Sequence, residues 1–121
     1  MKDFLNIPPD KIIFSNDYFF IIEDAFPVSP GHLLIISNIL RADYFSLIVE
    51  EQHALLGTIE IAKALIIDKY KPDGFNIGMN CGEAAGQTVF HFHCHLIPRY
   101  AGDMENPRGG VRYCIPDQGN Y

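Results

Sequence analysis

Three of the five histidines in this 121-residue chain fall within five positions, at strict two-residue spacing. They are His91, His93 and His95, and Phe92 and Cys94 occupy the positions between them. This alternation is the period of an extended strand, whose successive side chains face opposite sides. A strand rises about 3.3 Å per residue, so the three imidazoles share one face at steps of about 6 to 7 Å. Such a row is suited to binding an anionic group.

A row of histidines has two other interpretations. Imidazole is the commonest metal ligand in proteins, so the row is a candidate zinc site. A flat strand does not bring positions i, i+2 and i+4 to one tetrahedral ion, however, and a second element would have to supply ligands. The row also fits a half-buried strand whose polar face happens to be rich in histidine. We expect no metal site here.

The run from His91 to Ile97 resembles the signature of the histidine triad family of nucleotide hydrolases and transferases. That signature is His-x-His-x-His followed by two apolar residues, which are Leu96 and Ile97 here. The resemblance implies that His93 is the nucleophile. A neutral imidazole can attack phosphorus when its other ring nitrogen donates to a fixed acceptor. The resemblance also implies that His91 and His95 orient His93 and hydrogen-bond the phosphate oxygens.

Two residues earlier in the chain match further positions of the family. His32 matches a fourth histidine, contributed by a neighbouring strand, which holds the hydrogen-bond network of the triad in register. Asp24 matches a residue that accepts hydrogen bonds from the ribose hydroxyls, a task suited to two carboxylate oxygens. The local alternatives are a satisfied structural histidine and an aspartate that caps a turn. The region that walls the base pocket in the family contains Phe19, Ile21 and Phe26.

Asn80, Gln87 and Thr88 match polar contacts of the family to the phosphate and the leaving group. We expect Asn80 to end one strand and Gln87 and Thr88 to begin the next, so that all three border one phosphate. Backbone N–H groups near Gly86 can add donors without adding positive charge. Ordinary hairpin chemistry is the alternative, above all for Thr88.

Three arginines follow the triad. Arg99, Arg108 and Arg112 are candidates for contacts to a polyphosphate or to a partner subunit, because guanidinium groups bind phosphate bidentately. Solvated surface arginines are the alternative. Cys94 faces away from the histidines, and we expect it to pack in the core rather than to react.

The family resemblance implies a substrate in which a nucleoside monophosphate, usually AMP, is joined through its α-phosphate to a leaving group. His93 displaces that group to give a nucleotidyl-histidine, and water then attacks the same phosphorus. Positioning and hydrogen-bond donors supply most of the catalysis. No cofactor is required, although a divalent cation can accompany a polyphosphate substrate.

The segments around the triad bear on the leaving group. Gly-Gln-Thr-Val before it and Leu-Ile-Pro-Arg-Tyr-Ala-Gly-Asp from Leu96 onward resemble the fragile histidine triad branch, which cleaves diadenosine polyphosphates. The longer C-terminal extension of that branch is not present in the sequence. Dinucleoside polyphosphate hydrolysis is the predicted activity. Adenosine 5′-phosphoramidase activity, as in the nucleotide-binding branch, and a non-catalytic nucleotide-binding module are the alternatives.

Composition predicts one globular domain over residues 1–121, with a polar C-terminal tail from about residue 100. Hydrophobic residues make up 48% of the chain and charged residues 20%. We read neither a signal peptide nor a membrane span. The three cysteines are odd in number and form no Cys-x-x-Cys pair, which fits a reducing cytoplasm. The net charge of -6 argues against nucleic acid or an anionic membrane as partner.

Hydrophobic patterns predict α+β architecture. Strands are expected at residues 12–14, 18–23, 32–37 and 75–80, the first two forming a hairpin, and the last pairing antiparallel with the histidine strand. Apolar residues at three- and four-residue steps predict a long helix over residues 50–70, and a shorter one is expected near 43–47. Glu50 and Glu51 then stand in the first turn, where the helix dipole favours acidic groups. The order predicts an antiparallel sheet of about five strands with one long and one short helix.

The family forms homodimers in which the sheets join and the long helices pack together, so we expect a homodimer. The apolar face of the predicted helix fits either a core or such an interface. Its residues are Leu55, Ile59, Ala62 and Ile66.

Overall fold

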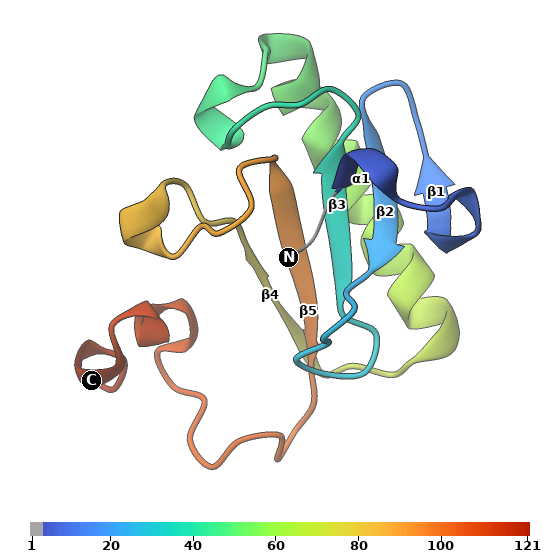
Figure 1. Ribbon diagram of the computed structural model, residues 1–121. Helices are drawn as coiled ribbons and strands as arrows, with labels where there is room; N and C mark the ends of the chain where they lie inside the picture. The colour runs from blue at the N-terminus through green and yellow to red at the C-terminus, as the bar shows by residue number, and fades with distance from the viewer. Residues whose placement is uncertain (1–3) are drawn as a thin grey trace.

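A computed structural model describes residues 4–121, which form an antiparallel sheet with one long helix, α1 (Val49–Lys69), against one face (Figure 1). The five strands lie in the order β1-β2-β3-β5-β4. Their bounds are β1 (Ile12–Ser15), β2 (Phe19–Glu23), β3 (Leu33–Ser37), β4 (Gly74–Gly78) and β5 (His93–Arg99). The predicted α+β class, the first hairpin and the number of strands are confirmed.

The helix α1 is fixed at its start by a side chain and along its length by the sheet. The Glu51 carboxylate accepts the backbone N–H of Ile48 at 2.8 Å, which satisfies a donor at the helix N-terminus. The buried residues of α1 are Glu51, Leu55, Thr58, Ala62 and Ile66. Ile59 packs against the same core, so the apolar helix face belongs to the core of this chain. The predicted second helix is a single 3₁₀ turn, Tyr44–Ser46, capped by Asp43.

The sheet buries different residues on its two faces. The side chains that pack under α1 include Phe19, Ile21, Ile35, Phe92, Cys94 and Leu96. On the opposite face, Phe4 from the N-terminal segment packs on Phe20, Ile22, Leu34 and Ile36. Cys94 is fully buried on the helix side, as predicted, and burial raises the pKa of its thiol to about 11. The thiol is therefore neutral at physiological pH.

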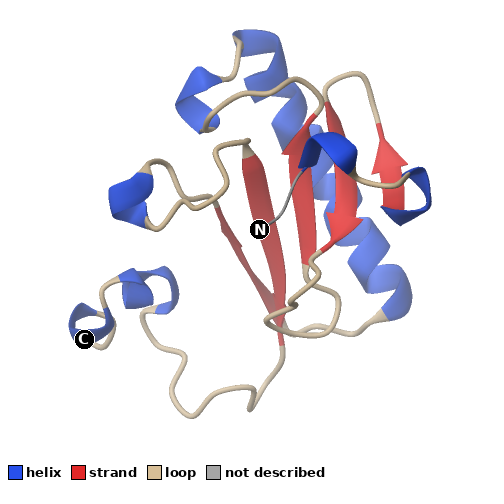
Figure 2. Cartoon of the chain, viewed as in Figure 1, coloured by secondary structure: helices blue, strands red, loops and turns tan. Residues whose placement is uncertain are grey.

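The strand ends differ from the prediction around the histidines. β4 ends at Gly78 and β5 begins at His93, so residues 79–92 form a connection that is loop apart from one 3₁₀ turn, Glu83–Ala85 (Figure 2). Asn80 therefore does not end a strand, Gln87 and Thr88 do not begin one, and His91 precedes β5. The physical reason is that the partner strand β3 stops at Ser37, leaving the preceding residues without a ladder.

The chain beyond residue 100 is a turn-rich tail beside β4. It contains two 3₁₀ helices, Gly110–Cys114 and Pro116–Gln118. The guanidinium carbons of Arg108 and Arg112 lie 4.5 and 4.9 Å from the ring centre of Tyr121, within cation–π range. Both arginines therefore help to hold the tail. No helix within residues 4–121 combines the length and the apolar character needed to cross a bilayer.

Candidate active site

The three histidine rings lie on the face of the sheet opposite α1. His93 and His95 of β5 pair in register with Ile36 and Leu34 of β3. The ring centroids of His93 and His95 are 5.4 Å apart. The Phe4 ring lies edge-on to both His91 and His93, at 5.7 and 5.0 Å between centroids. The predicted common face is therefore present, although His91 reaches it from outside the strand.

The position of the proton on His93 follows from its main-chain partner. His93 Nδ1 lies 2.8 Å from the backbone carbonyl oxygen of His91. A carbonyl oxygen can only accept, so the neutral ring carries its proton on Nδ1 and the lone pair on Nε2. This is the tautomer that an imidazole nucleophile requires.

His91 acts on His93 through its backbone. Its ring is only 3% exposed, and its Nε2–H donates to the carbonyl oxygen of Ser37 at 2.7 Å. The ring is thereby directed to β3 and not to a cleft. The predicted orienting role of His91 fits this geometry, whereas a contact from its ring Nε2 to phosphate does not.

His32 and His95 form a directed pair. The backbone N–H of Val28 donates to His32 Nδ1 at 3.0 Å, so the proton of a neutral His32 is on Nε2. That Nε2–H donates to His95 Nδ1 at 2.9 Å. The proton of a neutral His95 is therefore on Nε2.

Asp24 stands behind this pair. Its side chain is almost fully buried, and Oδ1 accepts the backbone N–H of Phe26 at 2.8 Å. The other oxygen, Oδ2, lies 3.5 Å from His32 Nε2 and 3.9 Å from His95 Nδ1. The contact of Asp24 to a ribose stays a prediction, and in the structure its carboxylate faces two imidazoles.

Three of these groups are close enough to be considered as metal ligands. Asp24, His32 and His95 each offer one ligand atom, and the three atoms lie within 4.8 Å of one another. A metal ligand must present a lone pair, however, and His32 Nε2 carries the proton because Nδ1 accepts from Val28. The donor set therefore favours a hydrogen-bond network, and the predicted absence of a metal stays a prediction.

The loop that carries His32 is fixed by a close approach at Gly31. This residue has φ +93°, and a Cβ atom there would lie 2.9 Å from the ring of Tyr70, just beyond the end of α1. Ser29 also donates from its hydroxyl to the carbonyl oxygen of Pro98 in β5, at 2.6 Å. The loop is therefore held against both α1 and the strand of the triad.

An open cleft of about 760 Å³, the histidine cleft, brings together most of the predicted site. It is lined by Ala25, Phe26, Asn80, Gly86, Gln87, Thr88, Val89, His93 and His95. Asn80 and Thr88 are exposed in it. Gln87 is buried, and its amide accepts from the N–H of Gly82 and donates to the carbonyls of Ala42 and Val89. Gln87 therefore braces the loop beside the cleft.

Two further clefts adjoin it. The apolar cleft, of about 790 Å³, shares His95, Asn80 and Gly86 with the histidine cleft and extends between β4, β5 and the tail. The N-terminal cleft, of about 670 Å³, shares Ala25 with it and includes Asp24 in its wall. The apolar walls of the N-terminal cleft include Phe4, Ile7, Ile13 and Ile22.

The three residues in the region matched to the base pocket lie on different faces of the sheet. Phe19 and Ile21 are fully buried under α1, on the wrong face of the sheet to line any of these clefts. Ile22 faces the N-terminal cleft, and Phe26 lines the histidine cleft with 81% of its surface exposed. Sequence analysis missed Phe4, which no local pattern connects with a triad far along the chain.

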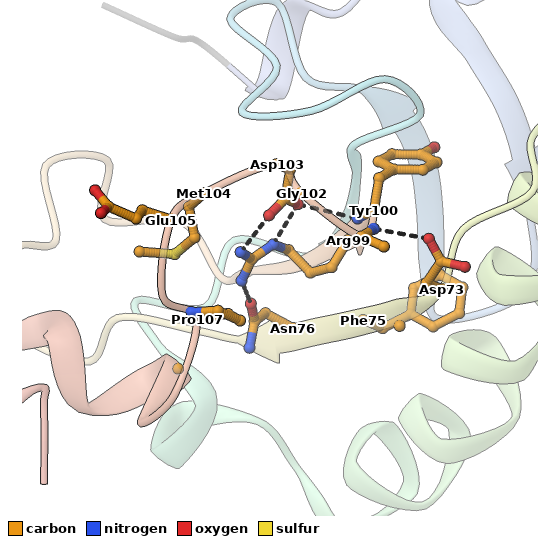
Figure 3. Close-up of a pocket in the computed structure, with 13 residues that line it drawn as sticks. Asp73, Phe75, Asn76, Arg99, Tyr100, Gly102, Asp103, Met104, Glu105 and Pro107 are labelled. Carbon is orange, nitrogen blue, oxygen red and sulfur yellow. Dashed lines mark hydrogen bonds and ion pairs between the residues drawn. The ribbon is translucent and has the colours of Figure 1, made fainter.

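Arg99 lies away from the histidines, in a separate cleft of about 420 Å³ (Figure 3). Its guanidinium donates to both carboxylate oxygens of Asp103, each at 2.8 Å, and to Asn76 Oδ1 at 2.6 Å. These bonds occupy Arg99, so the structure gives no support to a polyphosphate contact from this residue.

The Arg99–Asp103 pair leads to a testable prediction about the pKa of Asp103. The hydrogen bonds from Arg99 hold the pKa of the Asp103 carboxyl at about 2, below its ordinary value of 3.8. A lowered carboxyl pKa stabilises the fold above the ordinary value, and that contribution is lost as pH falls through the pKa of the folded state. We expect NMR titration to give a midpoint near 2 for Asp103, and Arg99→Gln to return it toward 3.8. An unchanged midpoint in Arg99→Gln would refute this cause.

Comparison with known proteins agrees with the geometry. Residues 7–102 match the model of the HIT domain family. A HIT-like protein of Mycoplasma genitalium is 40% identical over 88 residues, covering 70% of this chain and 60% of that protein. The bis(5′-adenosyl)-triphosphatase of Saccharomyces cerevisiae is 31% identical over 94 residues, covering 75% of this chain and 45% of the yeast protein.

A solved structure gives the same result. The crystal structure of a HIT family protein from Bacillus anthracis superposes with a TM-score of 0.72 at 35% identity, covering 77% of this chain and 66% of that one. The match to the family model, the antiparallel sheet and the His91–His93–His95 arrangement point to the same conclusion. The chain belongs to the HIT domain family.

Proposed function

We propose that this protein is a nucleotide hydrolase that cleaves at the α-phosphate of substrates in which AMP is joined to a leaving group. The observation that carries the proposal is the tautomer of His93. Its Nδ1–H is bound to the carbonyl of His91, which places the lone pair on Nε2. His95, with its proton on Nε2, lines the same cleft.

The reaction proceeds in two displacements at one phosphorus. His93 Nε2 attacks the α-phosphorus, the leaving group departs with the electron pair of its bond, and a nucleotidyl-histidine remains. Water then attacks the phosphorus, and the P–N electron pair returns to His93. Asn80, Thr88 and His95 border the phosphate in the histidine cleft, where fixed donors stabilise developing negative charge. The N-terminal cleft, with apolar walls and Asp24, accepts the nucleoside.

We propose dinucleoside polyphosphates as the substrates. The support is the yeast bis(5′-adenosyl)-triphosphatase, which is 31% identical to the chain over 94 residues. The sequence flanking the triad agrees with this choice.

The apolar cleft favours a second candidate, an adenosine 5′-phosphoramidase. This cleft is lined by His95 but not by His93, and we assign the leaving group to it. Its side chains are mostly apolar, and no lysine or arginine lines it among the described residues. They include Ile77, Ile97, Val111 and Ile115. Such a surface suits an apolar substituent on the leaving nitrogen better than a second polyphosphate.

A substrate panel tests the proposal. The kcat/KM values for diadenosine polyphosphates and for AMP amides with apolar substituents are compared on the purified protein. Higher kcat/KM for the polyphosphates supports the first candidate, and higher kcat/KM for the amides supports the second. A protein that binds AMP but turns over neither class refutes the enzymatic proposal and leaves a nucleotide-binding module.

A homodimer is part of the proposal. The described sheet ends at β4, which pairs with β5 on one side and has no strand on the other. An unpaired edge of this kind is a site where a second copy can extend the sheet.

A further inference from the structure

Asp24 has a second task besides the nucleoside contact. We propose that its carboxylate is the positioning group that allows His95 to take up a second proton and so act as a general acid. The inference rests on the proposed function, because it concerns the departure of the leaving group from the α-phosphate.

The argument begins with the proton count on the His32–His95 pair. Val28 donates to His32 Nδ1, so one proton lies between His32 Nε2 and His95 Nδ1, and another lies on His95 Nε2. In this state His95 can donate a hydrogen bond to phosphate. It cannot give its proton away, because an imidazolate would remain.

General acid catalysis therefore requires a second proton on His95. The only ring nitrogen of His95 with a lone pair is Nδ1, which then becomes an N–H group 2.9 Å from the Nε2–H of His32. Two N–H donors at that distance need an acceptor between them. If His32 moved its own proton from Nε2 to Nδ1, it would lose the hydrogen bond that Nδ1 accepts from the backbone N–H of Val28.

Asp24 Oδ2 is the acceptor in place. It lies 3.5 Å from His32 Nε2 and 3.9 Å from His95 Nδ1, so small rotations bring both N–H groups onto one carboxylate oxygen. Its negative charge, buried beside the pair, favours the cationic form of His95. The titratable groups of residues 4–121 that face His95 are Asp24, His32 and His93. Asp24 is the one acid among them.

The proton then follows the bonds to phosphorus. As His93 Nε2 bonds to phosphorus and the leaving atom takes the electron pair of its bond, His95 Nε2 gives its proton to that atom. His95 is left neutral, with its Nδ1–H directed to Asp24. In the second step, water bonds to phosphorus, the P–N pair returns to His93, and the proton of the water goes to His95 Nε2. The cycle releases AMP and the protonated leaving group.

The test is Asp24→Asn, which keeps an oxygen to accept from Phe26 and removes the charge. For an AMP amide, whose nitrogen must be protonated to leave, we expect kcat/KM at neutral pH to fall at least about tenfold. The descending alkaline limb of the pH profile should move to lower pH. For the 4-nitrophenyl ester of AMP, whose leaving group needs no proton, kcat/KM should fall only by the loss of the nucleoside contact, so the loss for the amide should exceed the loss for the ester at least about tenfold. Asp17→Asn, at an exposed position in the first hairpin, is the matched control.

Substrates with 2′,3′-dideoxyribose separate the two tasks of Asp24. If Asp24 acts only through the ribose, the loss in Asp24→Asn disappears with these substrates, and the inference is wrong. Equal losses for the amide and the ester overturn it as well. Should the wild-type protein hydrolyse no nucleotide, the proposed function fails, but NMR titration still decides the inference. The His95 transition, assigned with His95→Gln, should lie at lower pH in Asp24→Asn, and an unmoved transition refutes the role.

Discussion

Replacing His93 by alanine is expected to abolish nucleotide hydrolysis, with kcat/KM lowered by at least about a thousandfold. In the proposed mechanism, the substitution removes the lone pair on Nε2 that attacks phosphorus. Stopping the wild-type reaction on radiolabelled substrate with an alkaline denaturant, in which the P–N bond of a nucleotidyl-histidine is stable, should trap AMP on the protein, whereas His93→Ala should carry no label. Binding of AMP itself should persist, because His93 is not among the residues that line the N-terminal cleft.

The matched control for this variant is Cys94→Ala, one position along the same strand. Cys94 faces α1, is fully buried and carries a thiol whose pKa is raised to about 11 by burial. We expect Cys94→Ala to keep the wild-type kcat/KM and to be less stable, because it leaves a small void. A His93→Ala protein that still turned over every nucleotide substrate would exclude the covalent mechanism.

The largest effect on stability is expected from Arg41→Met. Arg41 Nε lies 2.9 Å from Oε1 of Glu51, whose side chain is 1% exposed at the start of α1. Without Arg41, the carboxylate stays buried with only the N–H of Ile48 as a described donor. Breaking such a pair typically lowers the free energy of unfolding by about 3 kcal/mol. Urea unfolding followed by circular dichroism measures the change.

The control for Arg41→Met is Lys63→Met, which removes an exposed cation from the same helix. We expect it to change the free energy of unfolding by less than about 0.5 kcal/mol. The double variant Arg41→Met, Glu51→Leu should lose less stability than Arg41→Met alone, because no charge is then left buried. A loss below about 1 kcal/mol in Arg41→Met would show that the pair behaves as a surface salt bridge.

Much of the fold was predictable because the patterns that define it are local. The two-residue period of the histidines identified β5 and its polar face, and three- and four-residue steps identified α1. The start of β5 was not predictable, since it depends on where the partner β3 stops, at Ser37. The burial of Glu51 was also not predicted, because nothing in the sequence around this first-turn acid indicates that it pairs with Arg41, ten residues earlier.

Which residues of the candidate site lie together was predictable, and their individual contacts were less so. His93 and His95 line one cleft with Asn80 and Thr88, as the family pattern implied. The contacts that the amide of Gln87 makes to its own loop were not predicted. Nor was the position of Phe19 and Ile21 under the helix, because the face of β2 that a residue occupies depends on the register of β2 with β3. A shift of one position exchanges the two faces of a strand, and the family resemblance alone did not fix it.

The two proton positions in the site are set by peptide groups, the carbonyl of His91 and the N–H of Val28. Peptide groups do not change when side chains are substituted. The ring at position 91 could be lost while His93 kept its tautomer, and at position 28 only proline, which has no N–H, would remove the donor. The tautomers of His93 and His32 are therefore set by the course of the backbone, and they can be retained when many of the surrounding side chains change.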